Sequence, residues 1–281
     1  MKTIKNQRFG EERALYNSHD LCLENCKFDG EEDGESALKE CKNIVVKDCY
    51  MNLRYPFWHI DGLKISGGEL TTNCRAALWY DKNVDITDSR MDGIKALREC
   101  RDIYLRSDTV NSPEFCWRSR NINIEDTEVN SEYGFFECRN LTAKGLKFSG
   151  KYSFQYTRNL HISHSSLDTK DAFWHAKNVT VTDSVVAGEY LGWYSDGLTF
   201  INCHIKGTQP LCYCKNLKLI NCTMENCDLA FEYSDVRADV KGEILSVKNP
   251  RKGVIEADRI GQIIRTDDSI YPVKAKILCR K

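Results

Sequence analysis

The sequence has no long apolar run, no surplus of charge of one sign and no secretion-type leader. Its longest apolar runs are a handful of residues, too short for a helix that crosses a bilayer. Its 40 basic and 41 acidic residues nearly balance, and no contiguous basic block occurs, so nucleic acid is not an expected partner. The first residues, MKTIKNQRFGEERALYN, are polar and contain no apolar core of a signal peptide. We therefore expect a cytoplasmic protein that has no membrane partner.

The dominant feature of the sequence is an internal repeat of 19 residues. Six copies follow one another from Cys100 to Tyr213 without an inserted or deleted residue. Outside this stretch, copies begin at Ser18 (a looser one), Cys41, Ile60 (with two extra residues), Asp81 and Cys214. Repeat positions are numbered 1 to 19 within a copy. A short period sustained over this many copies is typical of solenoid proteins.

Each copy contains the pattern of three short strands. Position 3 is Asn, Asp or Gly in the copies from Cys41 onward, and these residue types best tolerate a positive φ, so we expect a tight turn there. Apolar residues alternate at positions 4 and 6 and again at 9 and 11, which predicts two strands. A third strand is expected over positions 15 to 19. We assign positions 16, 18 and 1 to the interior and 15, 17 and 19 to the exterior, although Arg98 and Gln155 are polar exceptions at position 18.

The strands of one copy can pair only with the copies before and after it, which describes a solenoid. A left-handed β-helix would show three near-equal hexapeptides in each coil, and a leucine-rich repeat needs about 20 or more residues with a helical side. The sequence therefore predicts an all-β, right-handed parallel β-helix of about ten to eleven coils. We expect a single domain over residues 1–281, with an N-terminal cap at 1–17, coils at 18–232, and degenerate coils with a C-terminal cap at 233–281.

Cysteine is abundant, with 14 residues. Four cysteines share position 1 and four share position 9, as expected of small side chains that fill tight corners of a coil. A zinc site made by Cys203, Cys212, Cys214 and Cys222 is the alternative, but these spacings follow from the repeat and not from a zinc module. We expect free thiols in a reducing compartment, no bound metal and no cofactor.

Four segments carry a family resemblance: KDAFWHAKNVTV, GEYLGWYSDGLTFINC, LAFEYSDV and VKNPRKGVIEADRIG. Over nearly its whole length the chain resembles a bacterial family of unknown function built as a single-stranded right-handed β-helix of the pectate-lyase-like kind. This resemblance implies a fold and no particular activity. Because polysaccharide lyases, hydrolases and esterases dominate the wider superfamily, an oligosaccharide is the ligand that the analogy implies.

The chain departs from the enzymes of that superfamily. Its only adjacent aspartates, Asp267 and Asp268, fall in the predicted C-terminal cap, and it contains no Gly-His-Gly segment. It also has no cluster of acidic residues on one strand of the kind that holds calcium in pectate lyases. The resemblance therefore supplies no catalytic residue, and candidates come from the outward positions of the third strand.

Positions 15, 17 and 19 combine aromatic rings with carboxylates, an arginine and histidines. Rings stack on apolar sugar faces and carboxylates accept hydrogen bonds from hydroxyls, so this face has the composition of a sugar-binding groove. The predicted substrate-binding residues are Tyr133, Tyr156, Phe173, Tyr190, Tyr194 and Tyr213. The alternative is an exposed strand face, in which tyrosines stack for their β propensity and Glu99, Arg118 and Glu137 form an ion ladder.

For an enzyme, we name Glu137 as general acid and Glu99 as base. Both occupy position 19, two coils apart, so their backbones should be separated by roughly twice ~4.8 Å. That separation is at the outer edge of the range of roughly 6.5 to 9.5 Å for inverting pairs. Arg118 lies between them, and a cation there opposes the neutral acid that a hydrolase needs. Asp171 and His175 form a second predicted catalytic pair.

Three functions fit the sequence: an oligosaccharide-active enzyme, a non-catalytic glycan-binding solenoid, and a structural or interaction protein. A buried carboxylate pair with shifted pKa values would favour the enzyme. A smooth aromatic groove without such a pair would favour glycan binding, and a flat face with an exposed end coil would favour an interaction protein. The sequence leaves the oligomeric state undefined.

Overall fold

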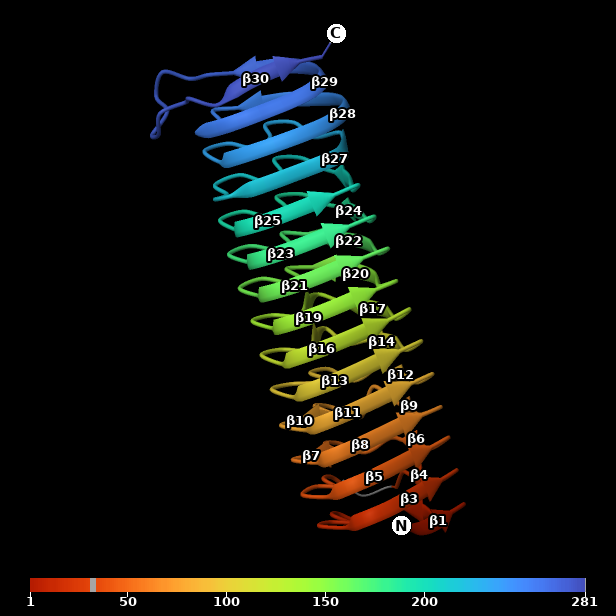
Figure 1. Ribbon diagram of the computed structural model, residues 1–281. Coiled ribbons are helices and arrows are strands. Elements are labelled where there is room, and N and C mark those ends of the chain that lie inside the picture. Colours follow the sequence, from red (N-terminus) through yellow and green to blue (C-terminus); the bar gives the residue numbers. More distant parts are fainter. Residues whose placement is uncertain (31–33, 281) are drawn as a thin grey trace. The chain divides into compact units, whose positions relative to one another are not determined.

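The computed structural model describes residues 1–30 and 34–280, and every regular element in them is a β-strand (Figure 1). The chain forms an all-β parallel β-solenoid of about 14 turns, more than the ten to eleven expected, and the predicted fold class is confirmed. The additional turns arise because the segments predicted as caps also form coils. β1 (Lys2–Lys5) pairs in parallel with β3 (His19–Glu24), and β28 (Asp235–Lys248) pairs with β29 (Lys252–Ile264). Within the described residues no helix is long and apolar enough to cross a membrane.

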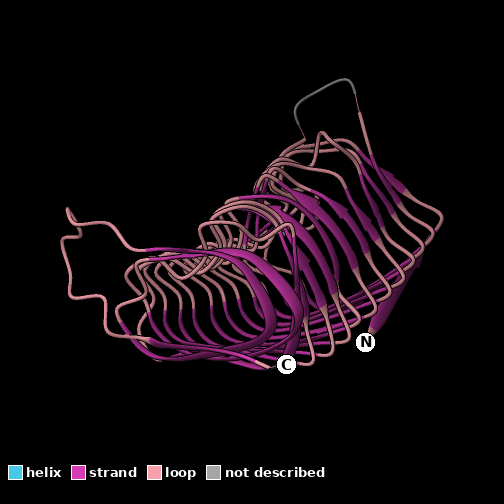
Figure 2. Cartoon of the chain, turned by 90° about the horizontal axis from the view of Figure 1, so that it is seen from above, coloured by secondary structure: helices cyan, strands magenta, loops and turns pink. Residues whose placement is uncertain are grey.

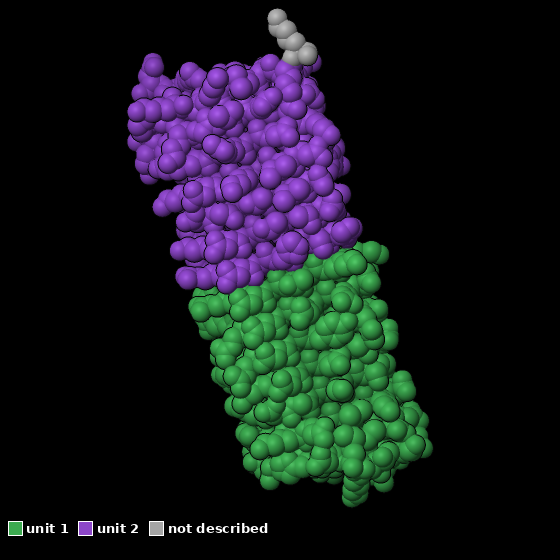
Figure 3. Space-filling model, viewed as in Figure 1, with its two compact units in different colours: residues 1–147 green, residues 148–281 purple. Residues whose placement is uncertain are grey.

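The chain divides into two compact units, residues 1–147 (unit 1) and 148–281 (unit 2), which Figure 3 colours separately. In unit 1 the first side of the coils consists of β1, β3, β5 (Lys42–Lys47), β8 (Asp61–Ser66), β11 (Lys82–Thr87), β13 (Arg101–Arg106), β16 (Arg120–Glu125) and β19 (Arg139–Lys144). The second side consists of β2 (Arg8–Phe9), β4 (Lys27–Phe28), β6 (Tyr50–Met51), β9 (Glu69–Leu70), β12 (Arg90–Met91), β14 (Thr109–Asn111) and β17 (Glu128–Ser131). The third side has short paired strands, β7 (Phe57–Trp58) with β10 (Leu78–Trp79) and β15 (Glu114–Phe115) with β18 (Tyr133–Gly134).

Unit 2 has coils of the same kind. Its first side consists of β21 (Arg158–Ser163), β23 (Lys177–Thr182) and β25 (Asp196–Ile201), and its second side of β20 (Lys147–Lys151, which begins one residue earlier), β22 (Ser166–Lys170), β24 (Val185–Ala187) and β26 (His204–Lys206). Both sides merge in the longer strands β27 (Leu217–Glu225), β28 and β29, and β30 (Lys276–Cys279) pairs with β29. Figure 2 shows that strands form part of each coil and that loops and turns complete it.

The turn predicted at position 3 is present in both units. Asn121, Asn140, Asn159 and Asn178 all have a left-handed backbone, with φ between 54° and 59°. Their side-chain amides stack: Asn140 Nδ2 donates to Asn121 Oδ1 at 3.0 Å in unit 1, and Asn178 Nδ2 donates to Asn159 Oδ1 at 3.3 Å in unit 2. The apolar side chains of positions 4, 6 and 11 fill the interior beside this turn, as predicted.

The assignment of position 17 to the exterior is wrong. Its side chains are buried in unit 1 and in unit 2, and Phe135, Phe154 and Phe173 are 0% exposed. The cause lies in the backbone, because in several copies positions 15, 17 and 19 all take left-handed φ values, as at Asp171 (55°), Phe173 (61°) and His175 (56°). The short paired strands β7, β10, β15 and β18 are exceptions to this pattern. With every second residue left-handed, side chains do not alternate between two faces as they do in a pleated strand. Position 1 and most of position 16 are buried, as predicted.

Position 18 forms a half-buried layer, and its polar exceptions have partners. Arg98 lies between two indole rings, with its guanidinium 5.1 Å from the centre of Trp79 and 4.9 Å from that of Trp117. Gln155 donates its side-chain amide to the carbonyl oxygen of Asp171 at 2.9 Å. Cation–π contacts and a hydrogen bond therefore let polar residues occupy this layer.

All 14 cysteines are free thiols, and only Cys279 is exposed. The cysteines at positions 1 and 9 lie at corners of the coils, where serine replaces them in other copies. The Cys100 thiol donates to Leu78 O at 3.7 Å, and one coil later Ser119 Oγ donates to Leu97 O at 3.0 Å. Cysteine and serine therefore bond the same kind of backbone group at this corner. In the described part of the chain, no three His, Cys, Asp or Glu side chains are arranged to hold a metal ion.

Candidate functional site

The tyrosines predicted at position 19 of unit 2 form a continuous stack. Neighbouring ring centres of Tyr156, His175, Tyr194 and Tyr213 lie 4.8, 5.0 and 4.7 Å apart, with planes 12°, 7° and 14° from parallel. Each ring covers the face of the next, so the exposed parts are ring edges and hydroxyl groups; Tyr156 is 48% and Tyr194 47% exposed. A sugar stacks on a ring face, and here those faces are occupied. The stack offers hydrogen-bonding groups rather than a stacking platform.

The other predicted substrate-binding residues lie in different surroundings. Phe173 is 0% exposed, with its ring centre 5.2 Å from that of Phe154, so its predicted contact with a ligand is wrong because position 17 faces the core. Tyr190 is half-buried, edge-on to Trp193 at 5.4 Å between ring centres. Tyr133 in unit 1 is 38% exposed.

The three charged residues predicted at position 19 of unit 1 lie together. Arg118 Nε donates to Glu137 Oε2 at 2.8 Å, and this hydrogen bond, followed by the charges of Glu137 and Glu99, raises the pKa of Arg118. The side chains of Arg118 and Glu137 are 50% and 41% exposed, so water screens the pair and it adds little to the stability of the fold. This arrangement matches the ion ladder that was the alternative for these residues.

Asp171 and His175 are not brought together as a catalytic pair. Burial raises the pKa of Asp171, and its further influences are the charges of Lys170 and Glu189. Burial alone lowers the pKa of His175, without a contribution from any carboxylate. His175 instead lies in the ring stack. Neither residue therefore orients the other or shifts its pKa.

A ladder of cations in unit 1 was missed by the sequence analysis. Lys82, Arg101, Arg120 and Arg139 occupy position 2 at the starts of β11, β13, β16 and β19, and each lies directly opposite the next in parallel register. Neighbouring members are therefore separated by one strand spacing, about 4.8 Å. In the sequence they are 19 residues apart, so no basic block is visible. The signal that reveals them is the composition of position 2 in successive copies, just as position 3 reveals the turn.

Few acids neutralise this ladder, although Asp61 lies directly opposite Lys82 in register on its other side. Arg101 Nε lies 4.0 Å from Asp102 Oδ2, at the limit for an ion pair, and the same nitrogen is buried without a hydrogen-bond partner. Lys82, Arg120 and Arg139 have no ion pair within residues 1–30 and 34–280. Like charges directly opposite each other in a sheet are destabilising. An unneutralised row of one sign attracts ligands of the opposite sign.

An open depression of about 310 Å³ adjoins the ladder. It is lined by His59, Tyr80, Asp81, Lys82, Glu99, Arg101 and Arg120. The rings of His59 and Tyr80 are stacked, with centres 4.9 Å apart. Asp81 is fully buried, and burial raises its pKa well above the ordinary value and so disfavours its charged form. We call this depression together with Arg139 the cationic corner.

The cationic corner combines groups that recognise two kinds of chemistry. Guanidinium groups bind carboxylates, sulfates and phosphates through paired N–H donors. The carboxylate of Glu99 and the Tyr80 hydroxyl accept hydrogen bonds from neutral hydroxyl groups. A ligand that carries both anionic groups and hydroxyls therefore fits the corner best.

Three solved structures resemble the chain. The A-module of the mannuronan C-5 epimerase AlgE4 of Azotobacter vinelandii has 10% identity and a TM-score of 0.42, over 92% of this chain and 90% of that one. The AlgE6 A-module of the same organism has 12% identity and a TM-score of 0.34, over 95% and 91%. An endo-xylogalacturonan hydrolase from Aspergillus tubingensis has 10% identity and a TM-score of 0.24, over 99% and 88%. These likenesses concern the fold alone.

No curated protein matches the chain in sequence. The family described as "Protein of unknown function (DUF3737)" matches residues 2–278, and the chain therefore belongs to this family.

Proposed function

We propose that the protein binds an extended acidic polysaccharide along the cationic corner of unit 1 and does not cleave it. The observation that carries this proposal is the in-register ladder of Lys82, Arg101, Arg120 and Arg139. A linear polymer with a carboxylate on its sugar units can lay successive anionic groups against successive cations. The uncompensated charge of the ladder supplies both the attraction and the orientation.

The acidic residue within the corner favours a glycan over a nucleic acid. Glu99 lines the depression between cationic side chains. The hydroxyl groups of a polysaccharide can donate hydrogen bonds to this carboxylate, whereas a phosphate backbone offers it only repulsion. The proposal therefore requires carboxylates and hydroxyls on the same polymer, which is the chemistry of a polyuronate.

Binding without cleavage is favoured by the state of the predicted catalytic groups. Hydrolysis of a glycosidic bond needs a protonated acid beside a second carboxylate. Glu137 accepts a hydrogen bond from Arg118 at 2.8 Å on an exposed surface, so its contact is with a cation and not with a second carboxylate. Asp171 and His175, the other predicted pair, do not influence each other's pKa.

The proposal is tested by calorimetric titration with polygalacturonate and alginate fragments, with dextran as the neutral control polymer. We expect 1:1 binding of the acidic fragments, weakened by added salt because exposed charges are screened. The double variant Arg101→Ala and Arg120→Ala should lower the affinity for the acidic fragments by roughly tenfold or more. A hydrogen bond to a charged group contributes about 1.5 to 3 kcal/mol, and each tenfold change in affinity corresponds to about 1.4 kcal/mol. Lys144→Ala, an exposed cation at the other end of β19, is the matched control.

Two results would contradict the proposal. The first is equal affinity of the double variant and the wild type for every acidic fragment. The second is tighter binding of a single-stranded oligonucleotide than of any polyuronate, which would identify the ladder as a nucleic-acid surface.

A further inference from the structure

Unit 2 contains a second cationic surface, on the outer face of β27, β28 and β29. Two adjoining open depressions of about 330 and 480 Å³ share Lys218 and Arg237 in their walls. They lie beside the place where the pairing of β27 with β28 shifts register after Leu219. This irregularity interrupts the otherwise even surface of the coils. Volumes of this size are in the range of about 300 to 1,000 Å³ that small-molecule sites occupy.

The two cations have no acid opposite them. Lys218 pairs in register with Thr199 on one side and Arg237 on the other, and Arg237 continues to Val254. In unit 1, by contrast, the outward Lys64 lies in register opposite Asp85. Two like charges placed side by side destabilise the sheet unless something neutralises them.

The acids that line the depressions already have partners. Asp235 binds Arg251 through both of its oxygens, and it also pairs with Lys252 at 3.2 Å. Burial tends to raise the pKa of Asp235, but these two cations outweigh it and lower the pKa. Asp239 pairs with Arg280 at 2.7 Å. Each carboxylate is therefore engaged, and neither is left to balance Lys218 and Arg237.

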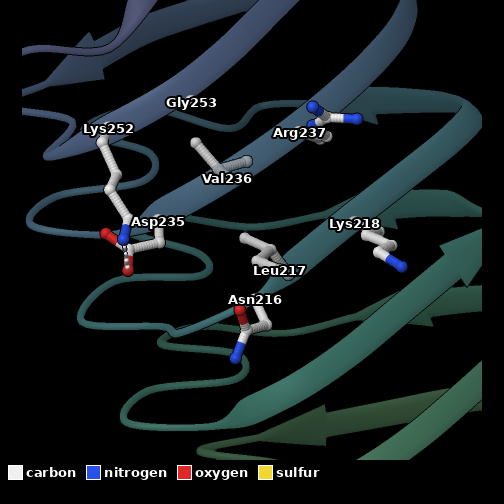
Figure 4. A pocket seen from close by; sticks show the side chains of 8 residues that line it. All are labelled: Asn216, Leu217, Lys218, Asp235, Val236, Arg237, Lys252 and Gly253. Atoms are coloured by element: carbon white, nitrogen blue, oxygen red, sulfur yellow. Dashed lines mark ion pairs between the residues drawn. The ribbon is translucent and has the colours of Figure 1, made fainter.

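Figure 4 shows how the first depression is arranged. Lys252 reaches down to Asp235 on one flank, Lys218 and Arg237 project on the other, and Leu217 and Val236 lie between the two flanks. Gly253 also lines the depression. Its φ is +107°, and a Cβ there would collide with the carbonyl oxygen of Val236, so no other residue fits without a shift of the backbone.

We propose that Lys218 and Arg237 bind the oxyanion of a small ligand, a carboxylate or a phosphate, whose remaining atoms occupy the depression beside them. Arg237 supplies paired N–H donors of fixed geometry, and Lys218 supplies a mobile point charge. The aliphatic parts of the lining side chains contact the body of the ligand. This site belongs to unit 2 and does not depend on the cationic corner of unit 1.

The test is a calorimetric titration of the full chain with three probes: inorganic phosphate, glucuronate and octanoate. Binding of phosphate alone would identify a phosphate ligand, binding of glucuronate a sugar acid, and binding of octanoate an apolar carboxylate. Glucose is the uncharged control and should not bind. Arg237→Ala and Lys218→Ala should each lower the affinity for the probe that binds by about tenfold, because each removes one charged contact. Lys241→Ala, an exposed cation further along β28, should leave the affinity unchanged.

The proposal is overturned if none of the three anions binds, or if both variants bind like the wild type. An unchanged thermal unfolding temperature of each variant would show that the variant is folded and that its loss of affinity is a loss of binding. The double variant Arg101→Ala and Arg120→Ala provides an internal comparison, since it should bind the three small probes normally. A loss in that variant would assign the small-anion site to unit 1 and refute its location on β27 and β28.

Discussion

Arg101 lies directly opposite Arg120 on neighbouring parallel strands, although both side chains are cations. Each also has a further cation on its other side, Lys82 beyond Arg101 and Arg139 beyond Arg120. Such an arrangement lowers stability, because like charges directly opposite each other in a sheet repel. The protein therefore carries a small electrostatic penalty at the cationic corner.

We expect Arg101→Gln to stabilise the protein while it weakens binding of a polyuronate. Removal of one charge relieves repulsion with Lys82 and Arg120, by roughly 0.2 to 1 kcal/mol at low salt. Urea unfolding at low and at high salt measures the effect, which should shrink as salt screens the charges. Lys144→Gln, outside the ladder, should change neither quantity. A variant that is less stable than the wild type at low salt would show that the ladder is not under repulsion.

Some of these features could be predicted from the sequence and others could not. The turn at Asn121 was predictable because few residue types take a left-handed backbone, and one of them recurs at position 3. The burial of Phe173 was not, because alternation is the normal expectation for a strand and no residue type marks a run in which every second residue is left-handed. Arg101 and Arg120 become neighbours only when the copies are stacked. The ring stack around His175 follows the alternative in which tyrosines of one position stack, but the near-parallel planes depend on side-chain angles that the pattern does not encode.

Asp108 should make stability depend on pH. It is 2% exposed, and burial raises its pKa from 3.8 to about 7, against the hydrogen bonds it accepts from the N–H groups of Ser89 and Arg106. The folded state then holds a proton that the unfolded state releases, so its stabilising effect is complete below pH 3.8 and disappears as the pH rises through about 7.

We expect Asp108→Ser to remove this dependence. Serine is the residue at the equivalent corner at Ser89 and accepts the same kind of hydrogen bond. Between pH 5 and pH 8 the wild type should lose on the order of 2 kcal/mol of unfolding free energy relative to the variant. Urea unfolding at several pH values measures the difference, and Asp168→Ser, at an exposed aspartate, is the control. Parallel curves for wild type and Asp108→Ser would exclude Asp108 as the titrating group.

Asp81 should be less favourable for stability than the serine that occupies the same repeat position in another copy. Its Oδ1 accepts from the N–H of Ile60 at 2.7 Å, whereas its Oδ2 is buried without a hydrogen-bond partner. Asp81→Ser should raise the free energy of unfolding by roughly 1 to 2 kcal/mol at pH 8, since serine fills this corner at Ser119 without burying a carboxyl oxygen that has no hydrogen-bond partner. The reverse change, Ser119→Asp, should destabilise by a similar amount. A loss of stability in Asp81→Ser would mean that the second oxygen has a partner after all.

The thiols should divide into one reactive and 13 protected groups in the folded protein. Burial raises the pKa of Cys41 and of Cys203 to about 11, so almost no reactive thiolate is present at neutral pH. Alkylation of the folded, unreduced protein should add one label, at the exposed Cys279, and alkylation in denaturant should add 14. Mass spectrometry counts the labels. Fewer than 14 in denaturant would reveal disulfides or modified thiols.

Glu137→Gln separates the binding proposal from the catalytic hypothesis, because the two predict opposite results. If Glu137 is only the partner of Arg118, its neutralisation frees a cation next to the corner, and polyuronate affinity should rise by a few-fold with a steeper salt dependence. If Glu137 is a general acid, the variant should keep its affinity and lose turnover, measured as new reducing ends in wild-type digests. Glu132→Gln, at an exposed glutamate nearby in the chain, controls for the change in net charge. We expect no turnover by the wild type and tighter binding by Glu137→Gln, and a wild-type activity abolished by this one substitution would refute the non-catalytic function.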